Sequence, residues 1–188
     1  METLVDNITA AVRPYFEVEL FPRASSPFIH FAARRSGRSH TECNVVVFDL
    51  DQPTLGSLQR QSVPGQALLS RLLPGPSTGR VPVLVGLSPH LGLVLSLDAS
   101  LLLEAEVEPL VYLENLPLRE LSACRWMPWE VTPFTEPAPT MVLLCCNVDL
   151  LAAALAFEIT ACGLDQGHRQ LVAEEMEADI SRLRGRHI

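Results

Sequence analysis

Apolar and polar positions follow a helical period at the two ends of the chain. Over residues 2–15, apolar side chains recur every three or four positions, which is the spacing of one helix face, and Pro14 marks the end of the segment. Residues 165–184 carry a similar stripe, made of Leu171, Val172, Met176, Ile180 and Leu183. The acids of this segment precede its arginines, as the helix dipole favours. The pattern predicts a helix at each end.

Shorter apolar runs between these two segments predict strands. They cover residues 16–21, 27–34, 43–50, 81–88, 91–98, 100–108 and 140–147. Gly37 and its neighbouring serines indicate a hairpin between the second and third run. Leucine and valine fill residues 91–98 almost without interruption, which predicts burial on both faces of that strand.

The remaining segments are helical or extended. Residues 53–73 have a helical pattern that Pro64 and Gly65 interrupt, and residues 118–126 and 149–162 also predict helices. Residues 109–116 fit either a strand or a short helix. Four prolines in residues 128–139 disfavour both helix and sheet pairing and predict an extended crossing segment.

This order of elements predicts an α+β fold. We expect an N-terminal helix, a mainly antiparallel sheet of about six or seven strands, and two C-terminal helices packed on it. A chain of 188 residues is long enough to bury a substantial core, so residues 1–188 are predicted to form a single domain with residues 128–139 inside it.

Composition points towards a protein partner. Hydrophobic residues make up 48% of the chain and charged residues only 19%, which favours self-association or another protein as a partner. The net charge of −8 argues against general nucleic-acid binding, because phosphates are neutralised by basic side chains. All 14 basic residues are arginine. A G+C-rich genome or avoidance of lysine-directed modification would each explain the absence of lysine.

Five cysteines without the spacing of a disulfide framework indicate reduced thiols. The first residues lack the basic and apolar regions of a secretory signal, and no apolar run is long enough to span a bilayer. We therefore expect a cytoplasmic or nuclear protein without a membrane span.

Two acidic residues follow a predicted strand in the segment VVVFDLDQPTLGSL (45–58). Asp49 and Asp51 have the spacing of the first motif of the haloacid-dehalogenase phosphatases, which this segment resembles over about ten residues. The resemblance implies a Mg-dependent phosphohydrolase with Asp49 as nucleophile and Asp51 as acid/base. Pro53 stands where that family has Thr or Val. The structural alternative is a strand end followed by a helix that Asp51 caps.

Two other groups of residues are candidates for binding. His40 and Cys43 could begin a zinc site completed by Cys145, Cys146, Cys162 or His168. Adjacent Cys145 and Cys146 would point to opposite faces of a strand, so at most one of them could serve such a site. The densest basic cluster, Arg34, Arg35 and Arg38, could contact an anion or an acidic partner, or could be a solvated hairpin tip.

The leading hypothesis is a non-enzymatic protein-interaction module, such as an adaptor, chaperone or assembly subunit, without a cofactor. Its interface is predicted on the stripe of Leu171, Val172, Met176, Ile180 and Leu183, although the same stripe could pack on the sheet. Two alternatives remain, the phosphohydrolase and a small-ligand sensory domain that uses residues 81–108 as pocket walls.

Overall fold

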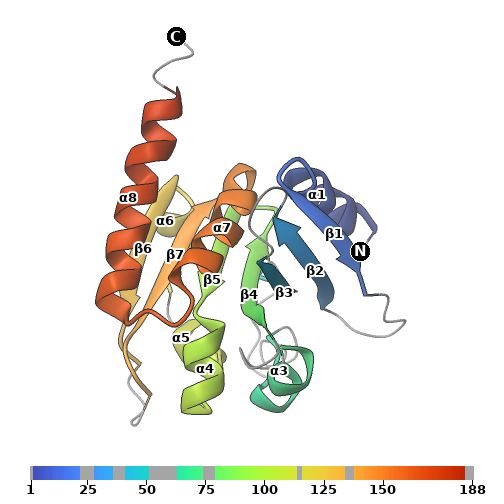
Figure 1. Cartoon of the computed structure of the whole chain (residues 1–188). Helices are drawn as coiled ribbons and strands as arrows, with labels where there is room; N and C mark the ends of the chain where they lie inside the picture. Colours follow the sequence, from blue (N-terminus) through green and yellow to red (C-terminus); the bar gives the residue numbers. More distant parts are fainter. Residues whose placement is uncertain are drawn as a thin grey trace.

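The computed structural model describes residues 2–21, 28–35, 41–50, 63–73, 79–113, 116–133 and 138–184. Its centre is a seven-stranded sheet (Figure 1). The strands are β1 (Phe16–Leu20), β2 (Ile29–Arg35), β3 (Glu42–Asp49), β4 (Arg80–Ser88), β5 (Leu93–Leu97), β6 (Trp126–Val131) and β7 (Met141–Asn147). The described helices are α1 (Glu2–Val12), α3 (Gln66–Leu72), α4 (Ala99–Ala105), α5 (Leu110–Leu113), α6 (Leu118–Leu121), η2 (Val148–Leu150), α7 (Leu151–Ala161) and α8 (Gln166–Arg184).

The strands lie in the order β1-β2-β3-β4-β5-β7-β6. β3 and β4 are parallel, and every other neighbouring pair is antiparallel. The antiparallel pairing of β2 with β3 agrees with the predicted hairpin, whose connecting residues 36–40 lie outside the described residues. The prediction of a mainly antiparallel α+β fold with terminal helices is confirmed.

Helices cover both faces of the sheet. On one face, α1, α7 and α8 enclose an apolar layer that includes Val12, Phe157 and Ala173. On the other face, α3 to α6 enclose a second layer that includes Leu69 and Tyr112. Successive residues of a central strand point into the two layers in turn, so all of β5 is buried, as its sequence predicts. Two apolar layers account for much of the chain's high apolar content.

The prediction of a strand at residues 100–108 is wrong. Residues 99–105 form α4, because the side chain of Asp98 caps this segment and accepts a hydrogen bond from the backbone N of Leu101 at 3.1 Å. The apolar run then packs against the second layer through one helix face, where Leu102 is fully buried. A buried helix and a buried strand have similar short apolar runs, which explains the error.

Two further segments differ from prediction. The helix expected over residues 118–126 ends at Leu121, and Trp126 begins β6 instead. Residues 128–131 pair with β7, although the four prolines of residues 128–139 predict no pairing; Pro128 lies opposite Leu144. An outer strand tolerates proline because only one of its edges needs hydrogen-bond donors. Residues 109–116, which fit either element, contain the short helix α5.

Helix boundaries follow local sequence. α1 ends at Val12, just before Pro14, and α3 begins directly after Pro64 and Gly65, as predicted. The first half of the predicted helix 53–73 lies mostly outside the described residues. α8 runs along β6 and extends beyond the sheet at its C-terminal end (Figure 1). Within the described ranges, no helix is long and apolar enough to cross a membrane.

Candidate functional site

The outer strand β1 presents backbone groups that no described strand pairs with. In an antiparallel pair, residues that exchange two hydrogen bonds alternate with residues that exchange none. Phe21 N donates to His30 O at 2.9 Å, which fixes this alternation at the end of β1. The backbone groups of Phe16, Val18 and Leu20 therefore point away from β2, towards the free edge.

The opposite edge, β6, is interrupted. Asn147 N donates to Arg125 O at 3.0 Å, and the same alternation then turns the backbone of Pro128 outward. Proline has no N–H, so the middle of this edge lacks the donor that an added strand would need. Of the two edges, β1 is the one whose outward positions all keep their donors.

The two faces of β1 differ in chemistry. On the face towards α1, Phe16 is buried and Val18 packs against the apolar layer, while Leu20 is 40% exposed. Glu17 and Glu19 alternate with them and are exposed on the other face. The strand is thus apolar on one side and acidic on the other.

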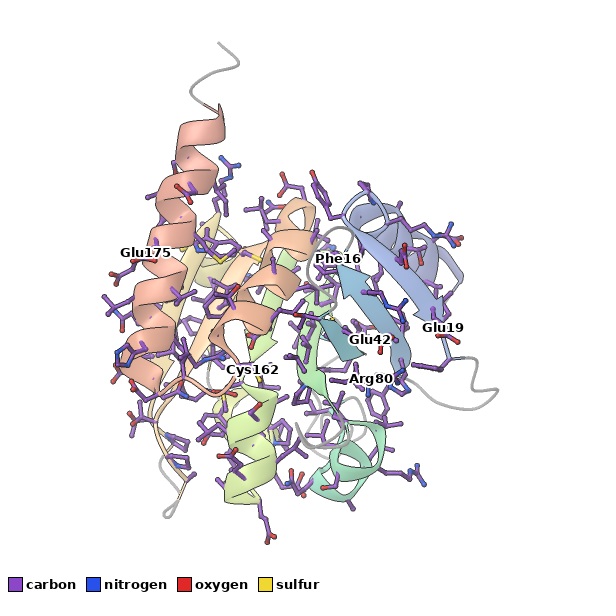
Figure 2. The ribbon with its side chains drawn as sticks, viewed as in Figure 1. Phe16, Glu19, Glu42, Arg80, Cys162 and Glu175 are labelled. Carbon is purple, nitrogen blue, oxygen red and sulfur yellow. The ribbon has the colours of Figure 1, made fainter. Side chains whose placement is uncertain are left out.

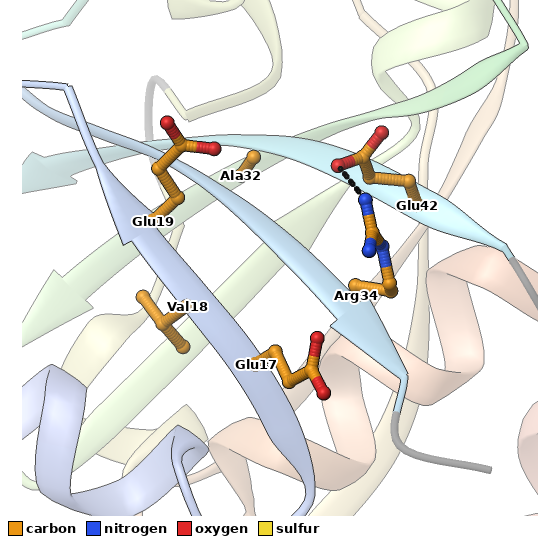
Figure 3. Close-up of a pocket in the computed structure, with 6 residues that line it drawn as sticks. All are labelled: Glu17, Val18, Glu19, Ala32, Arg34 and Glu42. Carbon is orange, nitrogen blue, oxygen red and sulfur yellow. Dashed lines mark hydrogen bonds and ion pairs between the residues drawn. The ribbon is translucent and has the colours of Figure 1, made fainter.

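A hollow of about 150 Å³ opens on the acidic side of β1 (Figure 3). Its lining consists of Glu17, Val18, Glu19, Ala32, Arg34 and Glu42. Glu42 accepts from Arg34 Nη2 at 3.4 Å and from Arg80 Nε at 2.8 Å. In Figure 2, Glu42 and Arg80 lie side by side and Glu19 lies at the outer strand. Arg34 and Arg80 thus both form ion pairs with Glu42. The described residues supply no ion pair to Glu17 or Glu19.

The predicted anion-binding arginines are only partly described. Arg34 is exposed and pairs with Glu42 inside the chain. The side chain of Arg35 and the whole of Arg38 lie outside the described residues. A role of this cluster in contacting an anion or an acidic partner therefore stays a prediction.

A buried group of charges, which the sequence did not suggest, connects the C-terminal helices to the sheet. Arg169 on α8 is fully buried, and its Nη2 donates to both carboxylate oxygens of Glu158 on α7, at 3.0 and 2.9 Å. Glu158 also accepts from Ser96 Oγ of β5 at 2.7 Å. The Arg169 Nε lies 3.4 Å from Asp98 Oδ2, and Gln166 Nε2 donates to the same oxygen at 2.9 Å. These contacts join α7, α8 and β5 to the N-cap of α4.

The pKa of Glu158 lies above its ordinary value. Burial is the main cause, because it disfavours the charged carboxylate; Arg169 opposes the shift and Asp98 adds to it. The group holds two carboxylates and one guanidinium, so taking up one proton makes it neutral. We interpret the group as a structural connection between α7, α8 and the sheet.

This shift gives the stability of the protein a pH dependence. A carboxyl whose pKa is raised on folding stabilises the fold below its unfolded pKa, near 4.5, and this contribution is lost as the pH rises through the folded pKa. In urea unfolding at a series of pH values, wild type should therefore lose stability relative to Glu158→Gln as the pH rises above about 4.5. A difference that is constant with pH would contradict the raised pKa.

Burial holds three of the cysteines, Cys43, Cys145 and Cys146, as thiols. Cys43 is buried in β3 and donates to Ala33 O at 3.3 Å, and burial raises its pKa to about 12. Burial likewise raises the pKa of Cys145 to about 12 and that of Cys146 still further. Cys145 belongs to one apolar layer and Cys146 to the other, as their adjacency predicts. Cys162 Sγ lies 3.7 Å from the hydroxyl of Ser100.

The remaining candidate sites are incomplete in the described structure. Asp49 ends β3, whereas Asp51 and His40 lie outside the described residues, so the phosphohydrolase and zinc hypotheses stay untested. In the part of the chain that the structure covers, no three His, Cys, Asp or Glu residues lie together as a metal would require. β4 and β5, the expected pocket walls, are central strands with helices on both faces.

The stripe of α8 divides between core and surface. Val172, Met176 and Ile180 are partly buried and pack against the apolar layer, whereas Leu171 is 56% exposed. The side chain of Leu183 lies outside the described residues. An interface at these five positions stays a prediction, and much of the stripe is engaged within the chain.

Comparisons of the chain with protein families, with curated proteins and with solved structures find no match.

Proposed function

We propose that this protein is a non-enzymatic protein-binding module, acting as an adaptor, chaperone or assembly subunit, and that its partner adds a strand to the free edge of β1. Strand addition uses main-chain hydrogen bonds for affinity and alternate side chains for specificity. β1 has both features: its outward backbone groups can form the main-chain hydrogen bonds, and its apolar and acidic faces can select the partner's alternate side chains.

The observation that carries this proposal is that the backbone N–H and C=O groups of Phe16, Val18 and Leu20 point away from β2. This direction follows from the hydrogen bond between Phe21 N and His30 O. An unpaired edge is a template for another strand, and proteins commonly block it with proline, with a bulge or with charge. The chain carries Pro128 at an outward position of β6. At β1 the outward positions are apolar residues with intact donors, and the charges of the strand, Glu17 and Glu19, both lie on one face.

Amide exchange followed by NMR tests whether this edge is free and usable. In the protein alone, the amides of Phe16, Val18 and Leu20 should exchange about tenfold or more faster than those of Glu17 and Glu19, which is the effect of one hydrogen bond of about 1 to 1.5 kcal/mol. A nine-residue peptide with alternating valine and threonine should slow the outward amides only. Equal protection of both sets in the free protein would overturn the proposal.

A matched pair of variants at one position strengthens this test. Val18→Pro removes the outward N–H without removing a hydrogen bond to β2, and it should abolish peptide binding while the circular dichroism spectrum is retained. Val18→Thr keeps the N–H and should bind as wild type does. Equal binding by the two variants would show that the peptide does not add to β1.

A further inference from the structure

A strand that pairs with β1 places its side chains on two faces with different chemistry, so each face favours a different kind of side chain. Directly opposite residues of neighbouring strands lie on the same face of a sheet. A partner residue opposite Glu17 or Glu19 therefore lies on the acidic face, and one opposite Val18 lies on the face covered by α1. Successive residues of the partner must alternate between these two environments.

The acidic face favours a cation. Glu17 and Glu19 are exposed and line the hollow, and Arg34 on β2 and Arg80 on β4 both form ion pairs with Glu42. This side of β1 therefore offers acceptors that a donor-rich cationic side chain can satisfy.

The other face favours an apolar side chain. Val18 is only partly buried against the apolar layer, and Leu20 is 40% exposed. Tyr15, just before the strand, is 63% exposed. An apolar residue added beside Val18 extends the existing layer and removes apolar surface from water.

A second copy of β1 does not meet these requirements. In a symmetric antiparallel pair centred on Val18, Glu17 of each copy lies opposite Glu19 of the other. Like charges directly opposite each other destabilise a strand pair. Pairing between two copies of β1 is therefore disfavoured, and pairing with a positively charged strand is favoured.

We propose that the strand added at β1 is basic: a segment of another protein in which arginine or lysine alternates with apolar residues. This inference rests on the proposed function and names the chemistry of the partner. The basic side chains lie over Glu17 and Glu19, and the apolar ones continue the layer formed by Phe16, Val18 and Leu20.

Peptide titration tests the charge of the partner. Three nine-residue peptides alternate valine with arginine, threonine or glutamate, and their affinities are measured by calorimetry. The arginine peptide should bind about tenfold more tightly than the threonine peptide, and the glutamate peptide most weakly. The double variant Glu17→Arg with Glu19→Arg reverses the charge of this face. It should bind the glutamate peptide more tightly than the arginine peptide.

A matched control separates a local effect from a general one. Glu175→Arg with Glu177→Arg, on the exposed side of α8, changes the net charge equally and should leave the preference for the arginine peptide unchanged. If this control exchanges the order as well, the charge inference is overturned.

Different results would contradict strand addition at β1 and the basic character of the added strand. If all three peptides bind with one affinity and Val18→Pro abolishes binding of each, strand addition stands and the basic strand is wrong. If no peptide slows the outward amides of β1, both are wrong. A dimer in light scattering that Val18→Pro dissociates would instead identify a second copy as the occupant and overturn the inference.

Discussion

Replacement of Arg169 by methionine is expected to lower the free energy of unfolding by about 3 to 5 kcal/mol. Arg169 is fully buried, and its guanidinium contacts Glu158 and Asp98, which are also buried. Removing the only cation of this group leaves two carboxylates in an apolar interior without a counter-charge, which is far more costly than losing an exposed ion pair. The variant also loses the position of the guanidinium over the ring of Phe157, 5.0 Å from its centroid.

Chemical denaturation measures this effect, with Arg13→Met as the control. Arg13 is exposed after α1, so its replacement should change stability by no more than about 0.5 kcal/mol. Replacing the whole group, by Arg169→Met with Asp98→Asn and Glu158→Gln, should cost less than Arg169→Met alone, because no unpaired charge remains. A loss below about 1 kcal/mol in Arg169→Met would show that the charges are not buried together.

Replacement of Trp126 by alanine is expected to cost about 3 to 5 kcal/mol. The indole is 4% exposed, packs edge-on against Phe157 with ring centroids 6.4 Å apart, and donates from Nε1 to Ala173 O on α8 at 2.8 Å. Alanine would leave a cavity between β6 and α8 and would lose the hydrogen bond from the indole.

A second substitution at the same position separates packing from hydrogen bonding. Trp126→Phe keeps most of the apolar volume and loses the donor, so it should cost about 1 to 3 kcal/mol. Trp129→Phe on the same strand, where the side chain is only partly buried, is the control and should cost less. Equal losses for Trp126→Phe and Trp126→Ala would show that the hydrogen bond, not the packing, dominates.

These two sites lie at the end of the sheet away from β1, since α8 packs on β6 and β7 whereas β1 is the outer strand on the other side. Their substitutions should therefore lower stability without changing the peptide preference of molecules that remain folded. Stability and binding are thus expected to be separable in this protein.

Local sequence signals determined most of the elements. The apolar period of residues 165–184 and the proline after α1 located both terminal helices, because amphipathic pattern and backbone restriction act within a few residues. The error at residues 100–108 arose where a short apolar run fits two structures. Asp98 was the local signal that decides between them, since it caps the helix.

The buried charges were beyond the reach of sequence reasoning. Arg169 resembles any arginine in an amphipathic helix. Glu158 lies 11 residues from it, but other contacts of the group join distant segments: Ser96 and Glu158 are 62 residues apart, and Asp98 and Gln166 are 68 apart. Which side of α8 faces inward depends on how the helix docks on β6 and β7, and that is a tertiary property.

The alternation of apolar and acidic positions over residues 16–20 can be read from the amino-acid order alone, because successive side chains of a strand point to opposite faces whatever its neighbours are. The fold sets three further properties: this strand is an outer one, the backbone at Val18 points to the free edge, and the proline-bearing strand forms the other edge. Sheet order and hydrogen-bond phase arise from pairings between distant segments, which no local pattern encodes.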